Sequence, residues 1–163
     1  MADDFSPYRN DESADRIQKV ETRLWLRMLS LHSEVYSRLN RALGTELGLS
    51  VAKFDVLAQL DRFRDGLTLG QLSRNLRVTG GNVSGLVRRL SADGLITREM
   101  SSEDRRSFFV RLTPKGASVF ESARRMHQRE LDECFSRASV DELDKALKAL
   151  NGLSSRMHRE TAE

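Results

Sequence analysis

The sequence is poor in cysteine, proline and long apolar runs, and each scarcity excludes a class of protein. Its single cysteine, Cys134, excludes an intrachain disulfide framework and a metal site built from several cysteines. Its two prolines are Pro7 and Pro114, so residues 15–50 contain no proline to break a helix, and long helices are permitted there. No apolar run approaches the length of a membrane-spanning helix, and the acidic N-terminus resembles neither a signal nor a transit peptide. We therefore expect a soluble, cytoplasmic chain with no membrane partner.

Charge is plentiful and unevenly placed. Charged residues make up 31% of the 163 residues, hydrophobic residues 39%, and the formal net charge is +3, which suits a globular domain. Residues 77–111 carry seven arginines against four acidic residues, whereas residues 1–16 carry five acidic residues against two arginines. A positive balance is compatible with nucleic-acid binding without requiring it. The middle of the chain is where such a partner would bind.

Apolar periodicity predicts a long first helix. From Ile17 to Leu39 apolar residues recur at three- and four-residue spacing, which makes one apolar helix face. This helix is expected from about residue 16 to residue 43, ending near Gly44 and Gly48. Residues 1–14 are acidic, polar and aperiodic, and we expect a flexible tail there.

Three short helices, a hairpin and two final helices are expected next. Ser50, Thr68 and Thr79 are plausible caps of the three short helices, and Gln71 completes a capping box with Thr68. Residues 95–100 and 107–112 read as two strands. Pro114 suits the first turn of the following helix, and a second capping box at Ser139 and Glu142 opens the last one. The fold class is therefore mainly α with a small β-hairpin wing after a helix-turn-helix.

The fourth helix has the composition of a DNA-recognition helix. An apolar stripe on one of its faces is expected to pack against the core and comprises Val83, Leu86, Val87 and Leu90. Such helices contact base edges in the major groove with their N-terminal residues, and here that end is small and hydrogen-bonding, with two arginines one turn later. The hairpin connection carries arginines that suit the narrow minor groove, and its aspartate could hold one of them in a bidentate pair. The predicted DNA-binding residues are Thr79, Gly81, Asn82, Ser84, Arg88, Arg89, Asp104, Arg105 and Arg106.

Plainer roles exist for each of these residues. Thr79 can serve as a helix cap, Asn82 and Ser84 can simply be solvated, and Arg88 and Arg89 cannot both point the same way. The pair Gly80-Gly81 costs about 1 kcal/mol of helix propensity per glycine. Close approach of DNA or tight packing against the preceding helix could each offset that cost. The hairpin connection could be a solvated turn.

Residues 67–116 resemble the DNA-binding core of the MarR (multiple antibiotic resistance regulator) family. The resemblance rests on Leu72, the run 78–90, Asp93-Gly94-Leu95-Ile96, Asp104-Arg105-Arg106 and Leu112-Thr113-Pro114-Lys115-Gly116. It implies a winged helix-turn-helix at residues 48–112, flanked by dimerisation helices at 15–47 and 113–160. It also implies a homodimer on a pseudo-palindromic stretch of double-stranded DNA, and repression as the family's commoner mode.

The resemblance further implies a small effector bound between the DNA-binding lobe and the dimerisation helices. Residues 24–29 and 54–60 are similar to regulators of aromatic-acid catabolism, so the expected effector is an aromatic acid or its acyl-CoA thioester. Aromatic and sulfur side chains on two facing helices, with one histidine, form the candidate ligand-binding set, although core and dimer contacts are the simpler role for each. The set is Trp25, Met28, Leu29, His32, Phe54 and Leu57.

The sequence also bears on functions of other classes. The sequence has no phosphate-binding glycine loop, nucleophile elbow or His–carboxylate metal motif, so an enzyme is disfavoured. No metal or cofactor is expected, because the three histidines lack ligand spacing. Cys134, next to Phe135, reads as a small buried hydrophobe. The alternatives from other classes are an architectural DNA-binding protein without an effector, and a protein of the same fold that has lost DNA contact.

Overall fold

The computed structural model describes the backbone of residues 9–100 and 108–159, and side chains from Arg16 onward within those ranges up to Met157. Six helices and three short strands follow one another in an order that matches the expected winged helix-turn-helix, with one additional strand. They are α1 (Arg9–Leu47), α2 (Val51–Arg62), β1 (Leu67–Thr68), α3 (Leu69–Leu76), α4 (Gly80–Ala92), β2 (Ile96–Met100), β3 (Phe108–Leu112), α5 (Pro114–Phe135) and α6 (Val140–Arg159).

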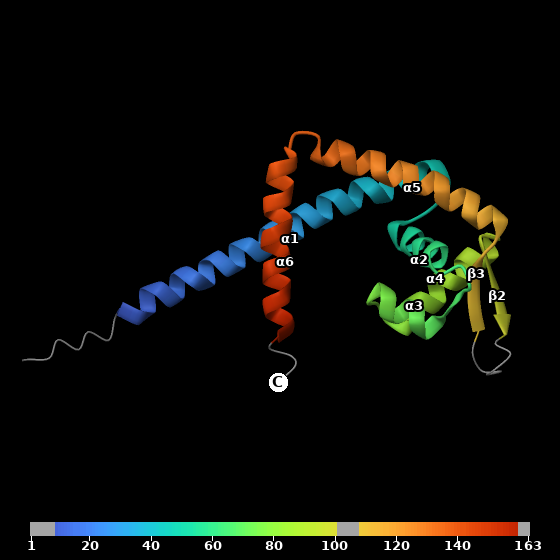
Figure 1. Ribbon diagram of the computed structural model, residues 1–163, viewed down its shortest axis with the longest axis horizontal. Coiled ribbons are helices and arrows are strands. Elements are labelled where there is room, and N and C mark those ends of the chain that lie inside the picture. Colours follow the sequence, from blue (N-terminus) through green and yellow to red (C-terminus); the bar gives the residue numbers. More distant parts are fainter. Residues whose placement is uncertain (1–8, 101–107, 160–163) are drawn as a thin grey trace, which may run out of the picture.

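Helix α1 is longer at both ends than the sequence predicts. It begins at Arg9, inside the segment expected to be a flexible tail, because no proline after Pro7 interrupts it. It passes through Gly44 and ends at Leu47, since Gly48 is the residue that adopts the left-handed conformation, with φ 63°. Its 39 residues span about 58 Å, and its N-terminal half extends away from the rest of the molecule (Figure 1).

The caps of the other helices largely follow the sequence prediction. The Ser50 hydroxyl accepts the Lys53 amide at 3.2 Å, and the Thr68–Gln71 capping box is complete. The Ser139–Glu142 box also forms, with the Ser139 amide donating to the Glu142 carboxylate at 2.8 Å. Pro114 occupies the first turn of α5. These local signals fix helix starts because each satisfies amides that have no partner inside the helix.

The sheet has one strand more than the expected hairpin. Strand β3 lies in the middle, antiparallel to β2 on one side and to the two-residue β1 on the other. Leu67 pairs with Val110 in register, and Ile96 pairs with Leu112. β1 ties the helix-turn-helix to the wing. Two residues are too few for a period-two pattern, which is why the sequence did not reveal the strand.

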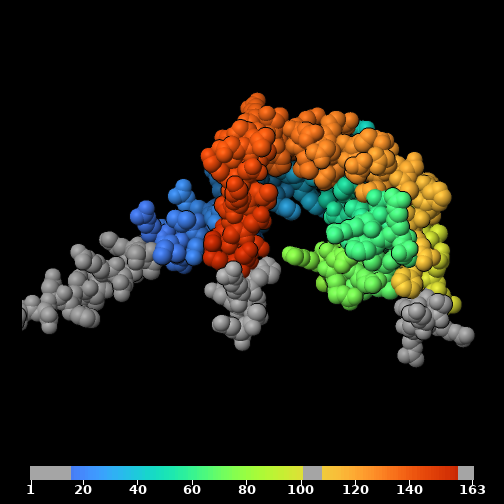
Figure 2. Space-filling view, viewed as in Figure 1, coloured from blue at the N-terminus to red at the C-terminus, as the bar shows by residue number. Residues whose placement is uncertain are grey.

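The core lies in the lobe formed by α2, α3, α4 and the sheet, with α5 and the C-terminal part of α1 over it (Figure 1). Leu57, Leu72, Val83 and Leu90 are fully buried there. Helix α6 stands apart, and an open gap separates it from the lobe in the space-filling view (Figure 2). None of the helices in the described ranges is long and apolar enough to cross a membrane.

Candidate nucleic-acid interface

Helix α4 has two distinct faces. Val83, Leu86, Val87 and Leu90 are buried against the lobe, and this confirms the apolar stripe that the sequence predicts. Because the stripe fixes the rotation of the helix, the polar residues are turned outward. The exposed set comprises Thr79, Gly80, Gly81, Asn82, Ser84, Arg88 and Arg89. Every residue predicted from α4 and its N-cap to contact DNA is therefore accessible.

The N-terminus of α4 lacks a side-chain cap. Thr79 occupies the N-cap position with extended backbone angles, but its side chain makes no capping hydrogen bond. The role of Thr79 as a side-chain cap, which the sequence favoured, is therefore wrong for this conformation. Its carbonyl still accepts the Val83 amide at 3.2 Å. The first amides of α4 are left exposed at the positive end of the helix dipole, where an anion is favoured.

Glycines near the start of α4 have no packing role. A Cβ built on Gly80 or Gly81 would meet no atom within 4 Å, and neither residue has a positive φ. Of the two explanations that the sequence left open, tight packing against the preceding helix is therefore excluded. The propensity cost of about 1 kcal/mol per glycine is not offset by any contact within the described chain.

The two arginines of α4 differ in their surroundings. A Cβ on Gly85 would lie 3.6 Å from the Arg89 guanidinium, so the Arg89 side chain folds back along the helix over Gly85. Both arginines are exposed. Two cations about two turns from the open N-terminus suit the path of DNA phosphates on either side of a groove.

An arginine near the base of the wing fixes the wing to the lobe, and sequence reasoning missed it. Arg111 on β3 donates through Nε to the Asp65 carbonyl at 2.8 Å and pairs with Glu99 on β2 at 2.5 Å. Its stem packs on Gly66, whose φ of 95° requires glycine, and a Cβ there would lie 2.8 Å from the Arg111 stem. The residues Arg64-Asp65-Gly66 are typical of a turn, but a turn pattern does not indicate which distant side chain contacts it. This contact connects the wing to the turn after α2.

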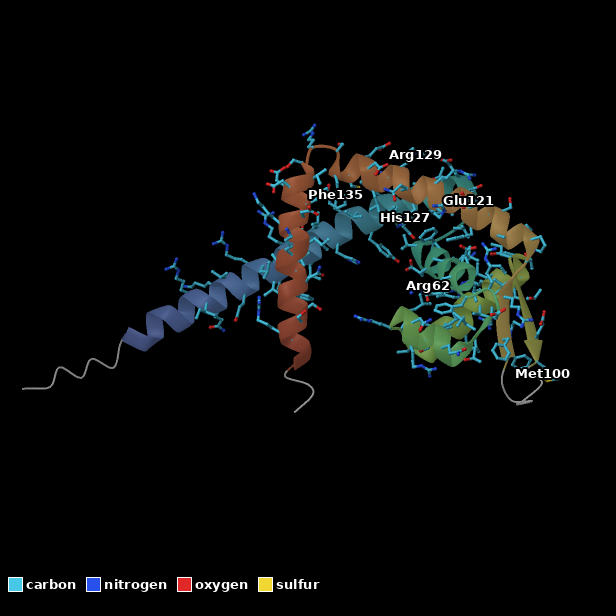
Figure 3. All side chains as sticks on the ribbon, viewed as in Figure 1. Arg62, Met100, Glu121, His127, Arg129 and Phe135 are labelled. Atoms are coloured by element: carbon cyan, nitrogen blue, oxygen red, sulfur yellow. The ribbon has the colours of Figure 1, made fainter. Side chains whose placement is uncertain are left out.

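The far part of the wing carries an exposed apolar and cationic surface. The Arg98 guanidinium lies 4.9 Å from the centre of the Phe108 ring, a cation–π contact. Met100, opposite Phe108 in register, is 62% exposed at the end of β2 away from α5 (Figure 3). Asp104, Arg105 and Arg106, the predicted wing residues, lie outside the described residues.

The predicted effector residues are not brought together within one chain. Phe54 and Leu57 are buried in the lobe, whereas Trp25 and Leu29 are 56% and 43% exposed on α1. Met28 and His32 of this set line the same cavity. That cavity, of about 410 Å³, lies between α1 and α6 and is lined by Met28, Leu31, His32, Val35, Tyr36, Leu39 and Leu150. His32 stacks on Tyr36 at 5.5 Å between ring centroids.

Phe54 instead joins the lobe to α5. Its ring stacks on His127 with centroids 4.6 Å apart, on the side of α5 that faces α2 (Figure 3). Burial lowers the pKa of His127, and the nearby Asp55 carboxylate partly opposes that shift. Burial raises the pKa of Asp55, with His127 again acting in the opposite sense. No group of three metal-ligating side chains occurs among the described residues. Cys134 is half-buried.

Comparison with known proteins identifies the family. A model of the MarR family matches residues 47–107. The crystal structure of a MarR family transcriptional regulator from Silicibacter pomeroyi is 45% identical, with a TM-score of 0.77, over 86% of this chain and 96% of that one. The chain belongs to the MarR family. The resemblance seen in the sequence is thereby confirmed, and so is the winged helix-turn-helix fold of a transcription regulator.

Two curated relatives differ in the direction of regulation. This MarR-family chain is 32% identical over 113 residues to the transcriptional activatory protein BadR of Rhodopseudomonas palustris, covering 68% of this chain and 64% of BadR. It is 30% identical over 111 residues to the transcriptional repressor YetL of Bacillus subtilis, covering 68% of this chain and 66% of YetL. The match thus spans just under two thirds of each relative's length.

Proposed function

We propose that this MarR-family protein is a sequence-specific transcription regulator that binds a pseudo-palindromic operator as a homodimer. The main support is the arrangement of helix α4, which buries one apolar face and exposes Asn82, Ser84 and Arg88, with no side-chain cap at its N-terminus. This arrangement suits insertion into the major groove. Asp104, Arg105 and Arg106 at the wing would contact the adjacent minor groove.

The homodimer is supported by apolar faces that no other described segment of the chain covers. Ile17, Val20 and Leu24 are exposed on α1, and Leu143 and Leu147 on α6. Contiguous exposed apolar faces on long helices mark an interaction surface. A helix such as α6, with little tertiary packing, depends on a partner for stability. A second copy of the chain would cover these faces and place two copies of α4 on successive major grooves.

The test is selection of binding sites from random DNA, with Arg106→Ala beside the wild type. We expect an enriched pseudo-palindrome, bound about 10³-fold or more above random DNA and more weakly by the variant. Absence of enrichment with retained salt-dependent binding would support the alternative, an architectural DNA-binding protein. Absence of any binding would indicate a protein of this fold without a DNA role.

The regulator is further proposed to respond to a small aromatic effector, an aromatic acid or its CoA thioester. The cavity between α1 and α6 supports this proposal because its apolar lining includes Met28, His32 and Tyr36. Binding would release the operator only if the effector has different affinities for the two states of the dimer. Repression is the proposed direction of regulation. Of the two curated relatives, YetL is named as a repressor and BadR as an activator.

Fluorescence of Trp25, the single tryptophan, provides the test of the effector. Benzoate and benzoyl-CoA are titrated against wild type and Met28→Ala, and operator affinity is measured with and without each compound. Saturable quenching that Met28→Ala weakens, with a parallel loss of operator affinity, is the expected result. Operator affinity that no compound changes would remove the effector proposal and leave the DNA-binding proposal intact.

A further inference from the structure

The turn between α3 and α4 contains a backbone conformation that normally selects glycine. The Val78 amide donates to the Ser73 carbonyl and the Arg77 amide to the Arg74 carbonyl, both at 3.2 Å. This pair of bonds defines a Schellman motif, in which the first residue after the helix is left-handed and usually glycine. Here that residue is Arg77, with φ 54° and ψ 39°.

Arg77 is an exception within its own chain. Among the described residues, the other positions with positive φ are Gly48, Gly66 and Gly94. A side chain in this conformation brings Cβ close to the backbone, so an arginine is disfavoured there relative to glycine. Folding alone would therefore favour glycine at residue 77. Strain of this kind is a reason to look for a function of the side chain.

The Arg77 side chain has no role within the described protein. It is exposed, and it makes no hydrogen bond, ion pair or ring contact with the described residues. Val78 beside it is also 40% exposed. Only Val78 and Thr79 separate Arg77 from the start of α4, so its backbone lies close to the uncapped N-terminus of that helix. An exposed cation at this place in the chain is within reach of a partner that binds α4.

We propose that Arg77 is a phosphate-binding residue that anchors the recognition helix on the DNA backbone. The inference rests on the proposed DNA-binding function and adds a contact to it. A guanidinium matches the paired oxygens of a phosphate in a bidentate geometry. Contacts of this type position the protein and carry no base information. Arg77 therefore adds equally to operator binding and to non-specific binding.

A purely structural role predicts a different result. A cation at the C-terminal end of α3 interacts favourably with the helix dipole. That interaction would change protein stability, but it would leave the salt dependence of DNA binding unchanged. The two roles are therefore separable by measuring stability and DNA binding on the same variants.

The experiment uses Arg77→Gly and Arg77→Asn in the full chain. Both replacements tolerate the left-handed conformation, so the urea midpoint is expected to stay level or rise. Operator affinity should fall about tenfold at physiological salt. The slope of log affinity against log salt should decrease by about 0.9 per lost contact, or about 2 for a dimer. Binding to random DNA should fall by the same factor, and Arg77→Lys should keep most of the slope.

Arg125→Asn is the matched control, because it removes an equal charge from an exposed residue of α5 whose partner Glu121 keeps Arg124. It should leave the slope unchanged. If Arg77→Gly and Arg77→Asn keep the wild-type affinity and the wild-type salt slope, the inference about Arg77 is overturned and the proposed function is unaffected. A loss of affinity with an unchanged slope would also overturn it, by showing an effect through the turn. A wild type that binds no DNA would overturn the proposed function and this inference with it.

Discussion

The lobe and the two arms of this protein, which are the N-terminal half of α1 and helix α6, use apolar residues in opposite ways. In the lobe, Leu57, Leu72 and Leu90 are fully buried, so its core is complete within one chain. On the arms, Trp25 is 56% exposed and Leu147 57% exposed. The same residue types therefore stabilise the fold in one region and are available to a second chain in the other. The difference indicates that the lobe folds by intrachain packing, whereas the arms need association.

The largest expected effect comes from a charge on the arm. Leu147→Asp should abolish the dimer, because burying an unpaired carboxylate at an apolar interface is costly. Operator affinity should fall by at least about 100-fold, since simultaneous binding of two half-sites is lost. Light scattering after gel filtration measures the molar mass, and a binding titration measures the affinity. Lys148→Asp, at the next exposed residue, is the control. A dimeric Leu147→Asp protein would show that this face does not form the interface.

The second effect belongs to the lobe. Leu72→Ala should lower the free energy of unfolding by about 3 kcal/mol, because it leaves a cavity in a fully packed core. Urea denaturation measures the loss. The variant should keep the molar mass of the wild type, the opposite of what Leu147→Asp does. A change of oligomeric state in Leu72→Ala would contradict the conclusion that the lobe stabilises the fold and the arms form the interface.

A smaller effect tests whether glycine near the start of α4 serves the close approach of DNA. Gly81→Ala should raise the free energy of unfolding by about 0.5–1 kcal/mol, because alanine has the higher helix propensity and its Cβ meets open space. Operator affinity should fall about tenfold if the backbone closely approaches DNA. Gly44→Ala, whose Cβ would lie 3.8 Å from the nearest atom outside its own helix backbone, should stabilise α1 without changing affinity. Equal operator affinity in both variants would contradict the close approach.

The smallest effect concerns the junction between lobe and arm at His127. Because folding lowers its pKa from the ordinary value of 6.5, the unfolded chain binds more protons than the folded chain as the pH drops through that value, and stability falls. The pKa of Asp55 is raised from its ordinary value of 3.8, so its contribution has the opposite sign and acts in a lower pH range.

We expect the melting temperature of the wild type to fall by about 2 °C more than that of His127→Phe when the pH is lowered from neutral to about 5.5. Phenylalanine keeps a ring on Phe54 without a titrating group, and scanning calorimetry at the two pH values gives the comparison. An equal fall in melting temperature for the two proteins would exclude His127 as a contributor to the pH dependence of stability.

Local signals made much of the fold predictable. The capping boxes at Thr68 and Ser139 and the apolar stripe of α4 involve residues three or four positions apart, and they fixed helix starts and faces correctly. The end of α1 was harder to predict from the sequence, because Gly44 and Gly48 are equivalent as sequence signals and only backbone conformation distinguishes them. For the same reason, Thr79 has the residue type of a cap without making the capping bond.

Long-range contacts could not be predicted from periodicity. The pairing of β1 with β3, and the bond from Arg111 to the Asp65 carbonyl 46 residues away, depend on how distant segments meet. The effector set shows the same limit. The sequence places Phe54 and Trp25 on helices expected to face each other, whereas the structure packs Phe54 against His127 of α5.

The sequence by itself determined the order of the helices, the hairpin of β2 and β3, the faces of α4 and the family to which the chain belongs, because these depend on residue types at short, fixed spacing. The tertiary structure decided which apolar residues form the core and which stay open to a second chain. It also decided that the glycines of α4 are free of packing and that Arg77 is held in a left-handed turn. Burial, open space and φ depend on where the whole backbone lies, so these features could be read only from the folded chain.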